Sequence, residues 1–231
     1  HLHSPFLHAY ALIYYPWNMS RGGWNRGFIP QFQWNFTNDR YYSVQKNKYV
    51  YKHQLNYGVK YYQTLPITGS GFYPRWGFGF SLMGGSAPGT GENFGNMVYL
   101  NGYFYFPGIT PQQGLKLTAT VQKQNVEGKV YYLSSYATLP RGYKDMTPTE
   151  NYAQATLDYA IPIYLGDYNL WTLLYFKRLT LIPFVDYAID VVPDYKQSIY
   201  WSAGSDLMVD IYPLRFNVPV SIGVRYAYTG P

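Results

Sequence analysis

The sequence predicts an all-β fold, an antiparallel transmembrane β-barrel. About ten segments of the chain alternate polar and apolar side chains with a period of two, as strands with two different faces do. Most of these segments span ~9–13 residues, longer than the ~5–6 residues usual in soluble sheets and long enough to cross a bilayer at a tilt. Aromatic residues make up 21% of the chain and recur near the segment ends, as in the interfacial girdles of membrane barrels.

The first five segments set large apolar side chains against polar or small ones. In residues 7–14, His8, Tyr10, Leu12 and Tyr14 alternate with Leu7, Ala9, Ala11 and Ile13. The next four apolar faces are Phe28, Phe32, Trp34 and Phe36; Leu55, Tyr57, Val59 and Tyr61; Trp76, Phe78, Phe80 and Leu82; and Val98, Leu100, Phe104 and Phe106. The faces opposite them carry Gln, Asn, Lys, Ser, Tyr and Gly. Such faces suit a wet or plugged lumen.

The remaining five segments follow the same rule. They are residues 115–126, 152–163, 179–189, 199–211 and 216–226. The first of them sets Leu115, Leu117, Ala119 and Val121 against Lys116, Thr118, Thr120, Gln122 and Gln124. Because a bilayer offers no water to pair with backbone groups, strands of this kind must close into a barrel. A soluble sandwich has shorter strands and an apolar face rich in Val, Ile and Leu, so the barrel is favoured.

The connections between segments differ in length on the two sides of the predicted barrel. Residues 107–114 and 212–215 are compact, as expected of periplasmic turns. Residues 37–48, 85–96 and 130–150 are longer and polar, and strict alternation of sides places all three on the external face. Residues 164–177 are long although they fall on the short-turn side. Within them, residues 170–176 are predicted to form a small interfacial helix or a strand extension.

Composition excludes several other classes of protein. The net charge is +6, but the 18 Lys and Arg residues are scattered, so we expect no nucleic-acid partner. The chain has no cysteine, which rules out a disulfide scaffold and thiolate metal sites. No stretch approaches the ~18 apolar residues of a transmembrane helix.

Catalysis and cofactors have little support in the sequence. All four histidines lie before residue 54, and the polar phase of His8 places it on a lumen wall. No nucleophile elbow, zinc-protease motif, phosphate-binding loop or dinucleotide-binding motif is present. The predicted lumenal carboxylates, Asp158, Asp186, Asp206 and Asp210, are expected to pair with Lys and Arg such as Arg225. We therefore predict no enzyme activity, no cofactor and no metal.

A five-residue motif in the longest connection suggests a family. It reads Leu139-Pro140-Arg141-Gly142-Tyr143, and a later strand carries Phe184-Val185-Asp186-Tyr187-Ala188. The two motifs resemble the sixth-loop Arg-Gly-aromatic tripeptide and the Phe-x-Asp-x-Gly strand of BamA-like outer-membrane assembly barrels, with Ala188 in place of the glycine. The segment from residues 103–108 through residues 174–178 resembles more specifically the barrel half of outer-membrane proteins whose soluble half is a TolB-type propeller. The resemblance covers residues 99–228.

This resemblance implies roles for single residues. Arg141 is expected to fold back into the lumen on its loop, with Asp186 as its partner or close to it. A lone charge in a narrow lumen would be costly, so pairing would pin the loop as a plug. Gly142 would permit a close backbone approach and Tyr143 would pack on the barrel wall. Leu139 and Pro140 complete the loop-plug motif. The alternative is a turn arginine that touches nothing.

The resemblance also implies the place of this chain in a larger barrel. If the motif loop joins strands eleven and twelve of about sixteen, as the family resemblance implies, the about ten segments here start near the sixth strand. Residues 1–231 are then expected to be part of one outer-membrane barrel domain, its C-terminal portion without the first strands and the final strand. A ten-stranded barrel closed on itself is the alternative.

Three functions are compatible with these observations. The first is a plugged BamA-like barrel of the bacterial outer membrane, acting in protein export or assembly or anchoring a soluble propeller. Its partners would be outer-membrane lipids and other outer-membrane or periplasmic assembly proteins. The second is an open outer-membrane channel for small solutes. The third is a soluble, Tyr-rich, glycan-binding sandwich.

Overall fold

The fold is a single antiparallel sheet. The computed structural model describes residues 7–43, 46–67, 71–88, 94–125, 127–129, 133, 135–144, 150–170, 174–191, 197–213 and 220–230. The strands are β1 (His8–Tyr14), β2 (Trp17–Asn18), β3 (Asn25–Ser43), β4 (Lys48–Thr64), β5 (Gly77–Ser86), β6 (Met97–Pro107), β7 (Gly114–Gln124), β8 (Asn151–Leu170), β9 (Leu174–Val191), β10 (Ser198–Pro213) and β11 (Val220–Thr229). Their order is β1-β3-β4-β5-β6-β7-β8-β9-β10-β11, with β2 paired to β3 beside this path. The predicted all-β, antiparallel class is confirmed.

The short hairpin between β2 and β3 was not predicted. Arg21 and Trp24 pair as an isolated bridge, and the backbone N–H of each donates to the carbonyl of the other. Gly22 and Gly23 form the two-residue loop between them, with φ of 61° and 81°. A loop with positive φ at both positions matches the twist of the flanking strands, and glycine adopts it without strain. The Gly-Gly pair was the sequence signal for this turn.

Several strands run further than the alternation indicated. Most of the predicted loop 37–48 is strand, because β3 and β4 stay paired up to Ser43 opposite Lys48. Leu170 and residues 174–176 extend β8 and β9, which pair up to Leu170 opposite Leu174, and residues 171–173 lie outside the described residues. For the described part of this segment the strand extension was therefore the right alternative and the helix the wrong one. Register shifts interrupt β3 after Thr37 and β8 after Tyr164. Such bulges break the period-two pattern, which is why the pattern stopped short.

The predicted connections are described only in part. Residues 107–114 form a compact turn, in which the Gly108 N–H donates to the Gln113 carbonyl at 3.0 Å. The turn at 212–215 and the start of the last predicted segment include residues 214–219, which lie outside the described residues. Parts of the connections 85–96 and 130–150 lie outside them as well.

The sheet buries a polar face and exposes an apolar one. In β9, every second residue from Thr180 to Asp190 is buried, and the side chains between them point to the other face. The buried face of the sheet is polar, and its buried polar residues include Asn56, Thr120, Gln122, Gln154, Asp158, Asp186, Ser202 and Asp210. Exposed residues of the opposite face include Leu82, Leu100, Val121, Leu157, Val185, Trp201 and Leu207. A protein folded in water usually has the reverse arrangement.

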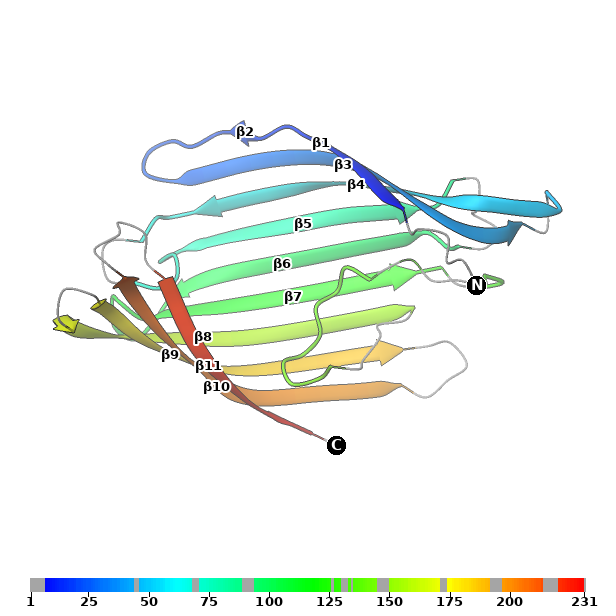
Figure 1. Ribbon diagram of the computed structural model, residues 1–231. Helices are drawn as coiled ribbons and strands as arrows, with labels where there is room; N and C mark the ends of the chain where they lie inside the picture. Colours follow the sequence, from blue (N-terminus) through cyan, green and yellow to red (C-terminus); the bar gives the residue numbers. More distant parts are fainter. Residues whose placement is uncertain are drawn as a thin grey trace.

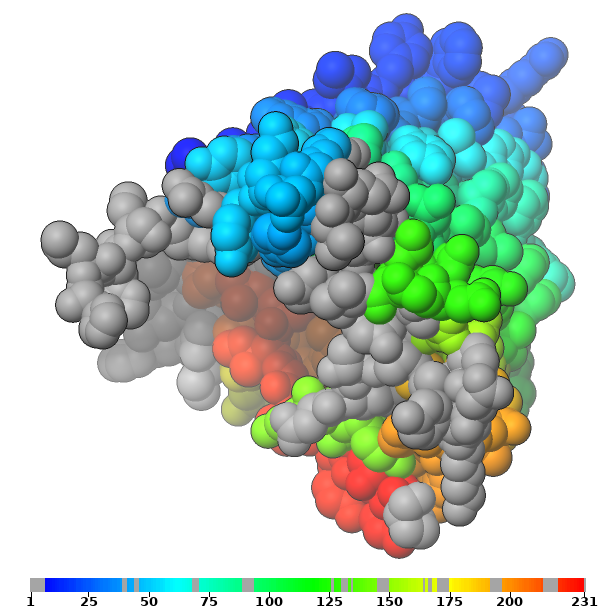
Figure 2. All heavy atoms as spheres, turned by 90° about the vertical axis from the view of Figure 1, so that its right-hand side faces the viewer, coloured from blue at the N-terminus to red at the C-terminus, as the bar shows by residue number. Residues whose placement is uncertain are grey.

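The sheet is strongly curved but not closed. Figure 1 shows the strands curling from β1 at the top to β11, which crosses in front of its neighbours. From the side, the described strands follow one another around the molecule, from blue at the top to orange and red at the bottom (Figure 2). Among the described residues β1 pairs only with β3, and β11 only with β10. The ten-stranded barrel closed on itself is therefore not what the structure shows.

Two other expectations depend on this architecture. A sandwich needs two sheets packed face to face, whereas the described strands form one sheet. The described strands therefore do not show the two-sheet architecture of the sandwich alternative. Within the described part of the chain, no helix combines the length and apolarity needed to span a membrane.

Candidate functional site

The connection between β7 and β8 lies on the polar face of the sheet. Within it, residue 133 and residues 135–144 are called the inner loop, which crosses in front of the strands in Figure 1. The side-chain amide of Gln124 donates to the carbonyl of Leu133 at 2.9 Å and accepts from its N–H at 3.2 Å. Leu133 is buried with Ala87, Phe94 and Met97 in a small apolar cluster. This cluster and the two hydrogen bonds of the Gln124 side chain fix the position at which the inner loop begins.

Gln122 holds the next residues of the inner loop. Its side-chain oxygen accepts from Ser135 Oγ at 2.9 Å and from the N–H groups of Tyr136 and Ala137 at 3.0 and 3.2 Å. Further along, the Tyr152 hydroxyl donates to the Thr138 carbonyl at 2.8 Å. Side chains of the polar face thus satisfy loop backbone groups that a strand ladder would otherwise pair.

The predicted motif forms a tight turn at the tip of the inner loop. The N–H of Tyr143 donates to the Pro140 carbonyl at 3.3 Å, and Gly142 has φ of +95°. A positive φ at the third position of such a turn favours glycine. A Cβ on Gly142 would lie 2.6 Å from the side chain of Thr229, so a larger residue would collide with the chain beside it. Pro140 is fully buried, and Leu139 is half-buried.

Arg141 is bound by two aspartates of neighbouring strands. Its Nε and Nη2 donate to the two carboxylate oxygens of Asp186 at 2.9 and 2.7 Å, and its backbone N–H donates to Asp186 at 2.8 Å. Its Nη2 also lies 2.6 Å from the Asp158 carboxylate. The guanidinium carbon sits 3.5 Å from the centre of the Phe184 ring. This two-pronged, charge-assisted contact is among the stronger kinds in proteins.

The strand register explains why these side chains meet. Asp158 lies opposite Phe184 in the β8–β9 pair, and Asp186 lies two residues further along β9 on the same face. On β10, Asp206 lies 3.9 Å from Arg141, and it binds Arg225 of β11 at 2.7 Å. Three carboxylates therefore surround Arg141, and Arg225 balances part of their charge. We call Arg141, Asp158, Asp186, Asp206 and Arg225 the latch cluster.

Burial and charge act in opposite directions on Arg141. Burial by itself lowers the pKa of the guanidinium, but hydrogen bonds and charge from Asp186 and Asp158 outweigh burial and raise the pKa above its ordinary value. Arg141 is therefore positively charged at neutral pH. Its side chain is only 15% exposed, so the charge depends on its carboxylate partners.

Tyr143 links the motif to the last two strands. Its hydroxyl lies 3.0 Å from the Trp201 carbonyl and 3.1 Å from the Gly230 carbonyl. Its ring meets Tyr200 edge to face, with the ring centres 5.3 Å apart. With Arg141 on β8 and β9 and Gly142 against Thr229, three consecutive residues of the motif touch four strands.

A second arginine fixes the other end of the polar face. Arg178 of β9 binds the Asp210 carboxylate, with Nε–Oδ2 at 2.9 Å, and its Nη1 donates to the Gly71 carbonyl at 2.6 Å. Its guanidinium also lies over the Phe72 ring, 5.3 Å from the ring centre. The connection between β4 and β5 is thereby held against β9. Nothing in the sequence pattern indicated this contact, because it joins residues far apart in the chain.

The expected contact between Arg141 and Asp186 is present. Asp158 was expected on the polar face but not as a partner of Arg141, since alternation gives the face and not the alignment of neighbouring strands. Arg225 pairs with a carboxylate of the polar face, Asp206, as expected. In the described part of the chain, no group of three or more metal-binding side chains is arranged to hold an ion.

No model of a protein family matches this chain, and neither the curated proteins nor the solved structures contain a significant match to it.

Proposed function

We propose that this chain belongs to a bacterial outer-membrane β-barrel of the BamA-like type, plugged by its inner loop. The observation that supports this proposal best is that the sheet has one apolar and one polar face and that the latch cluster lies on the polar face. The exposed face is apolar, the buried face is polar, and an arginine on an inward-folded loop is bound by aspartates of that polar face.

The apolar face supports a membrane location. Large exposed residues recur on all the long strands, from Phe80 on β5 to Leu157 on β8 and Val224 on β11. A monomer in water rarely exposes a continuous apolar surface of this extent. Lipid tails are the partner that this chemistry fits, and unpaired backbone at the two sheet edges would need strands to close the barrel in a membrane.

The latch cluster supports a plugged rather than an empty lumen. An inner loop attached only at its ends would leave a wide polar passage. Here Gln122 and Gln124 hold the start of the loop, and the latch cluster holds its tip. A loop tied in this way occupies the space beside β7 to β11 and resists displacement by water or solutes.

The role in protein export or assembly, or as an anchor for a soluble propeller, rests on the resemblance of the two motifs. The order of the motif loop, one strand and the Asp-bearing strand is what that resemblance requires, and Asp186 sits where the family's aspartate would. The polar face alone is equally consistent with the second candidate, an open channel for small solutes.

Two successive experiments test membrane integration and plugging. The protein is expected to remain in the outer-membrane fraction through an alkaline carbonate wash, and its release into the supernatant would refute the membrane assignment. In planar bilayers the wild type is expected to conduct poorly and the Arg141→Ala variant to conduct more. Arg21→Ala, in the exposed hairpin, serves as the matched control. A high wild-type conductance that Arg141→Ala leaves unchanged would favour the open channel.

A further inference from the structure

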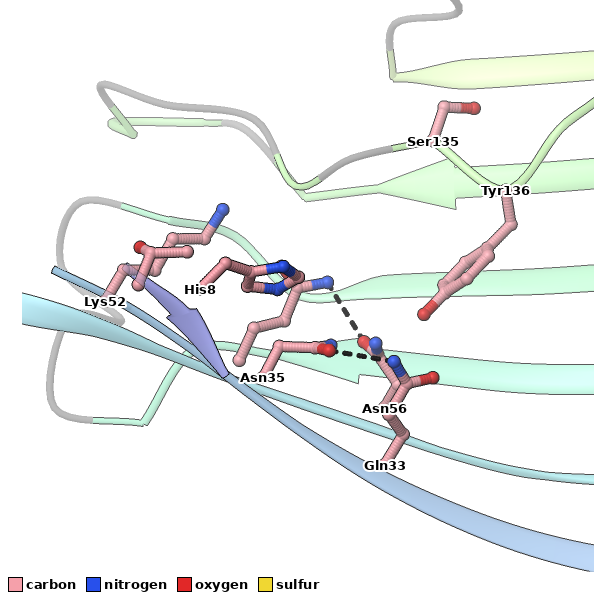
Figure 3. A pocket seen from close by; sticks show the side chains of 9 residues that line it. His8, Gln33, Asn35, Lys52, Asn56, Ser135 and Tyr136 are labelled. Carbon is pink, nitrogen blue, oxygen red and sulfur yellow. Dashed lines mark hydrogen bonds between the residues drawn. The ribbon is translucent and has the colours of Figure 1, made fainter. Parts of the chain in front are cut away.

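A polar hollow lies at the other end of the inner loop, away from the latch cluster. It has a volume of about 300 Å³, at the lower end of the range for small-molecule sites. Strands β1, β3 and β4 form one wall, and Ser135 and Tyr136 of the inner loop form the other (Figure 3). The hollow is separate from the latch cluster, since none of the latch residues lines it.

The register aligns its strand wall in rows. Thr37 of β3 lies between His8 of β1 and Lys52 of β4. The next two rows pair Asn35 with Gln54 and Gln33 with Asn56. Four carboxamides therefore form a two-by-two patch on the wall, and Figure 3 shows the side chains of Gln33, Asn35 and Asn56 gathered there.

These carboxamides retain capacity for a ligand. Gln33 donates to Asn35 at 2.8 Å and Gln54 donates to Asn56 at 3.0 Å. A carboxamide has two N–H donors and an oxygen that accepts twice. Within the described part of the chain these two bonds are the only ones that the four groups make, so both donors and acceptors are left over.

The hydroxyl of Thr37 gives a second, independent indication. Its Oγ1 is buried and has no hydrogen-bond partner among the described residues, although it belongs to the lining of the hollow. A buried hydroxyl without a partner costs free energy, and a ligand hydroxyl would satisfy it. On the opposite wall, Gln122 fixes Tyr136, whose ring also contacts Tyr99 at 5.9 Å between centres. The aromatic wall is thus held in position facing the carboxamide patch.

We propose that this hollow binds a short neutral saccharide. Sugar hydroxyls both donate and accept hydrogen bonds, as carboxamides do, and the apolar face of a sugar ring packs on an aromatic side chain. Among the described residues that line the hollow there is no carboxylate, and the Lys52 ammonium lies over the Phe94 ring, 4.7 Å from its centre. The site rests on the proposed function only in needing the inner loop folded inward, which supplies the Tyr136 wall.

The test is calorimetric titration of the detergent-purified protein with maltose, cellobiose, lactose and N,N′-diacetylchitobiose, each in turn. At least one of them is expected to bind. Asn35→Ala or Gln33→Ala should weaken that binding about tenfold, as loss of a ligand hydrogen bond does. Tyr136→Ala should weaken it and Tyr136→Phe should retain most of it. Asn101→Ala is the matched control, because Asn101 is an amide of the same face that bonds to Thr120 and lies outside the hollow.

Three results would overturn the assignment. They are no heat of binding with any of the four disaccharides, equal affinity in wild type and Asn35→Ala, or binding of glucuronic acid in preference to all four. Carbonate extraction and bilayer conductance report on the proposed function separately. A protein that stays in the membrane and conducts poorly but binds no saccharide would refute only this inference.

Discussion

Arg141 shows how one residue can determine where a loop lies. Its guanidinium is held by Asp186 through two bonds and by Asp158 through a third, and the ring of Phe184 covers it. Breaking a buried ion pair by removing one partner leaves the other charge without compensation. Here the loss of Arg141 would leave Asp158 and Asp186 close together, with Arg225 bound to Asp206 as the remaining nearby cation.

The stability of the latch cluster can be measured by a double-mutant cycle. We expect Arg141→Ala to destabilise the docked inner loop by about 3–5 kcal/mol, because two buried carboxylates lose their shared partner. Asp186→Asn should also destabilise it. The combined variant should cost less than the sum of the two single changes, by about 0.5–3 kcal/mol. Urea unfolding together with amide hydrogen exchange of the inner loop gives these values, and strict additivity would contradict the proposed coupling.

At the scale of elements, side-chain amides of β7 bind backbone groups of the inner loop, which no neighbouring strand pairs in the described part of the chain. Gln122 and Gln124 lie two residues apart on the same face of β7, and both turn toward the loop. One side-chain oxygen of Gln122 accepts from three donors of the loop. The loop is therefore attached at its start by amides and at its tip by charges.

Replacing Gln122 tests the attachment at the start of the loop. Gln122→Leu leaves the Ser135 hydroxyl and the Tyr136 N–H without their acceptor, whereas the Ala137 N–H keeps Ser135 Oγ at 3.1 Å. We therefore expect docking to weaken by roughly 2 kcal/mol. Amide exchange at Tyr136 and Ala137 should accelerate accordingly. Asn101→Leu is the control, since Asn101 bonds to Thr120 on the same face and does not hold the loop. Equal acceleration in both variants would mean that Gln122 has no specific role.

At the scale of the whole molecule, the sheet is polar where it is buried and apolar where it is exposed. The described residues form one curved sheet with free edges at β1 and β11, and the inner loop and the connection held by Arg178 cover parts of its polar face. Among the described residues, no segment of the chain covers the apolar face. The proposed membrane location would place the apolar face against lipid, whereas a protein folded in water usually buries its apolar face.

A charge introduced on the apolar face distinguishes a lipid environment from water. Val185 is 53% exposed on β9, and in a bilayer Val185→Arg should destabilise the fold by about 2–4 kcal/mol if the position lies near the midplane. At an exposed position of a water-soluble protein the same change would cost within about 0.5 kcal/mol. Ile109→Arg is the control, because Ile109 is 92% exposed in the turn between β6 and β7. Urea unfolding in lipid vesicles measures both, and equal small effects would argue against a lipid-facing sheet.

The sequence by itself determined the strands, the two faces and the candidate motif. Period-two alternation is a local property, so it identified ten of the eleven described strands, all except β2, without reference to any neighbour. Alternation placed Asp158, Asp186 and Asp206 on the polar face, but it did not predict how neighbouring strands align. The Gly-Gly hairpin and the bulges were missed because they interrupt the pattern on which the prediction relied.

Only the tertiary structure decided which residues meet. Arg141 binds Asp158 as well as Asp186 because of the alignment of β8 with β9, and Arg178 reaches the Gly71 carbonyl because the sheet curves. The hollow beside Thr37 exists because β1, β3, β4 and the inner loop converge. These contacts join residues distant in the chain and depend on register and curvature, which are set by the packing of the whole sheet.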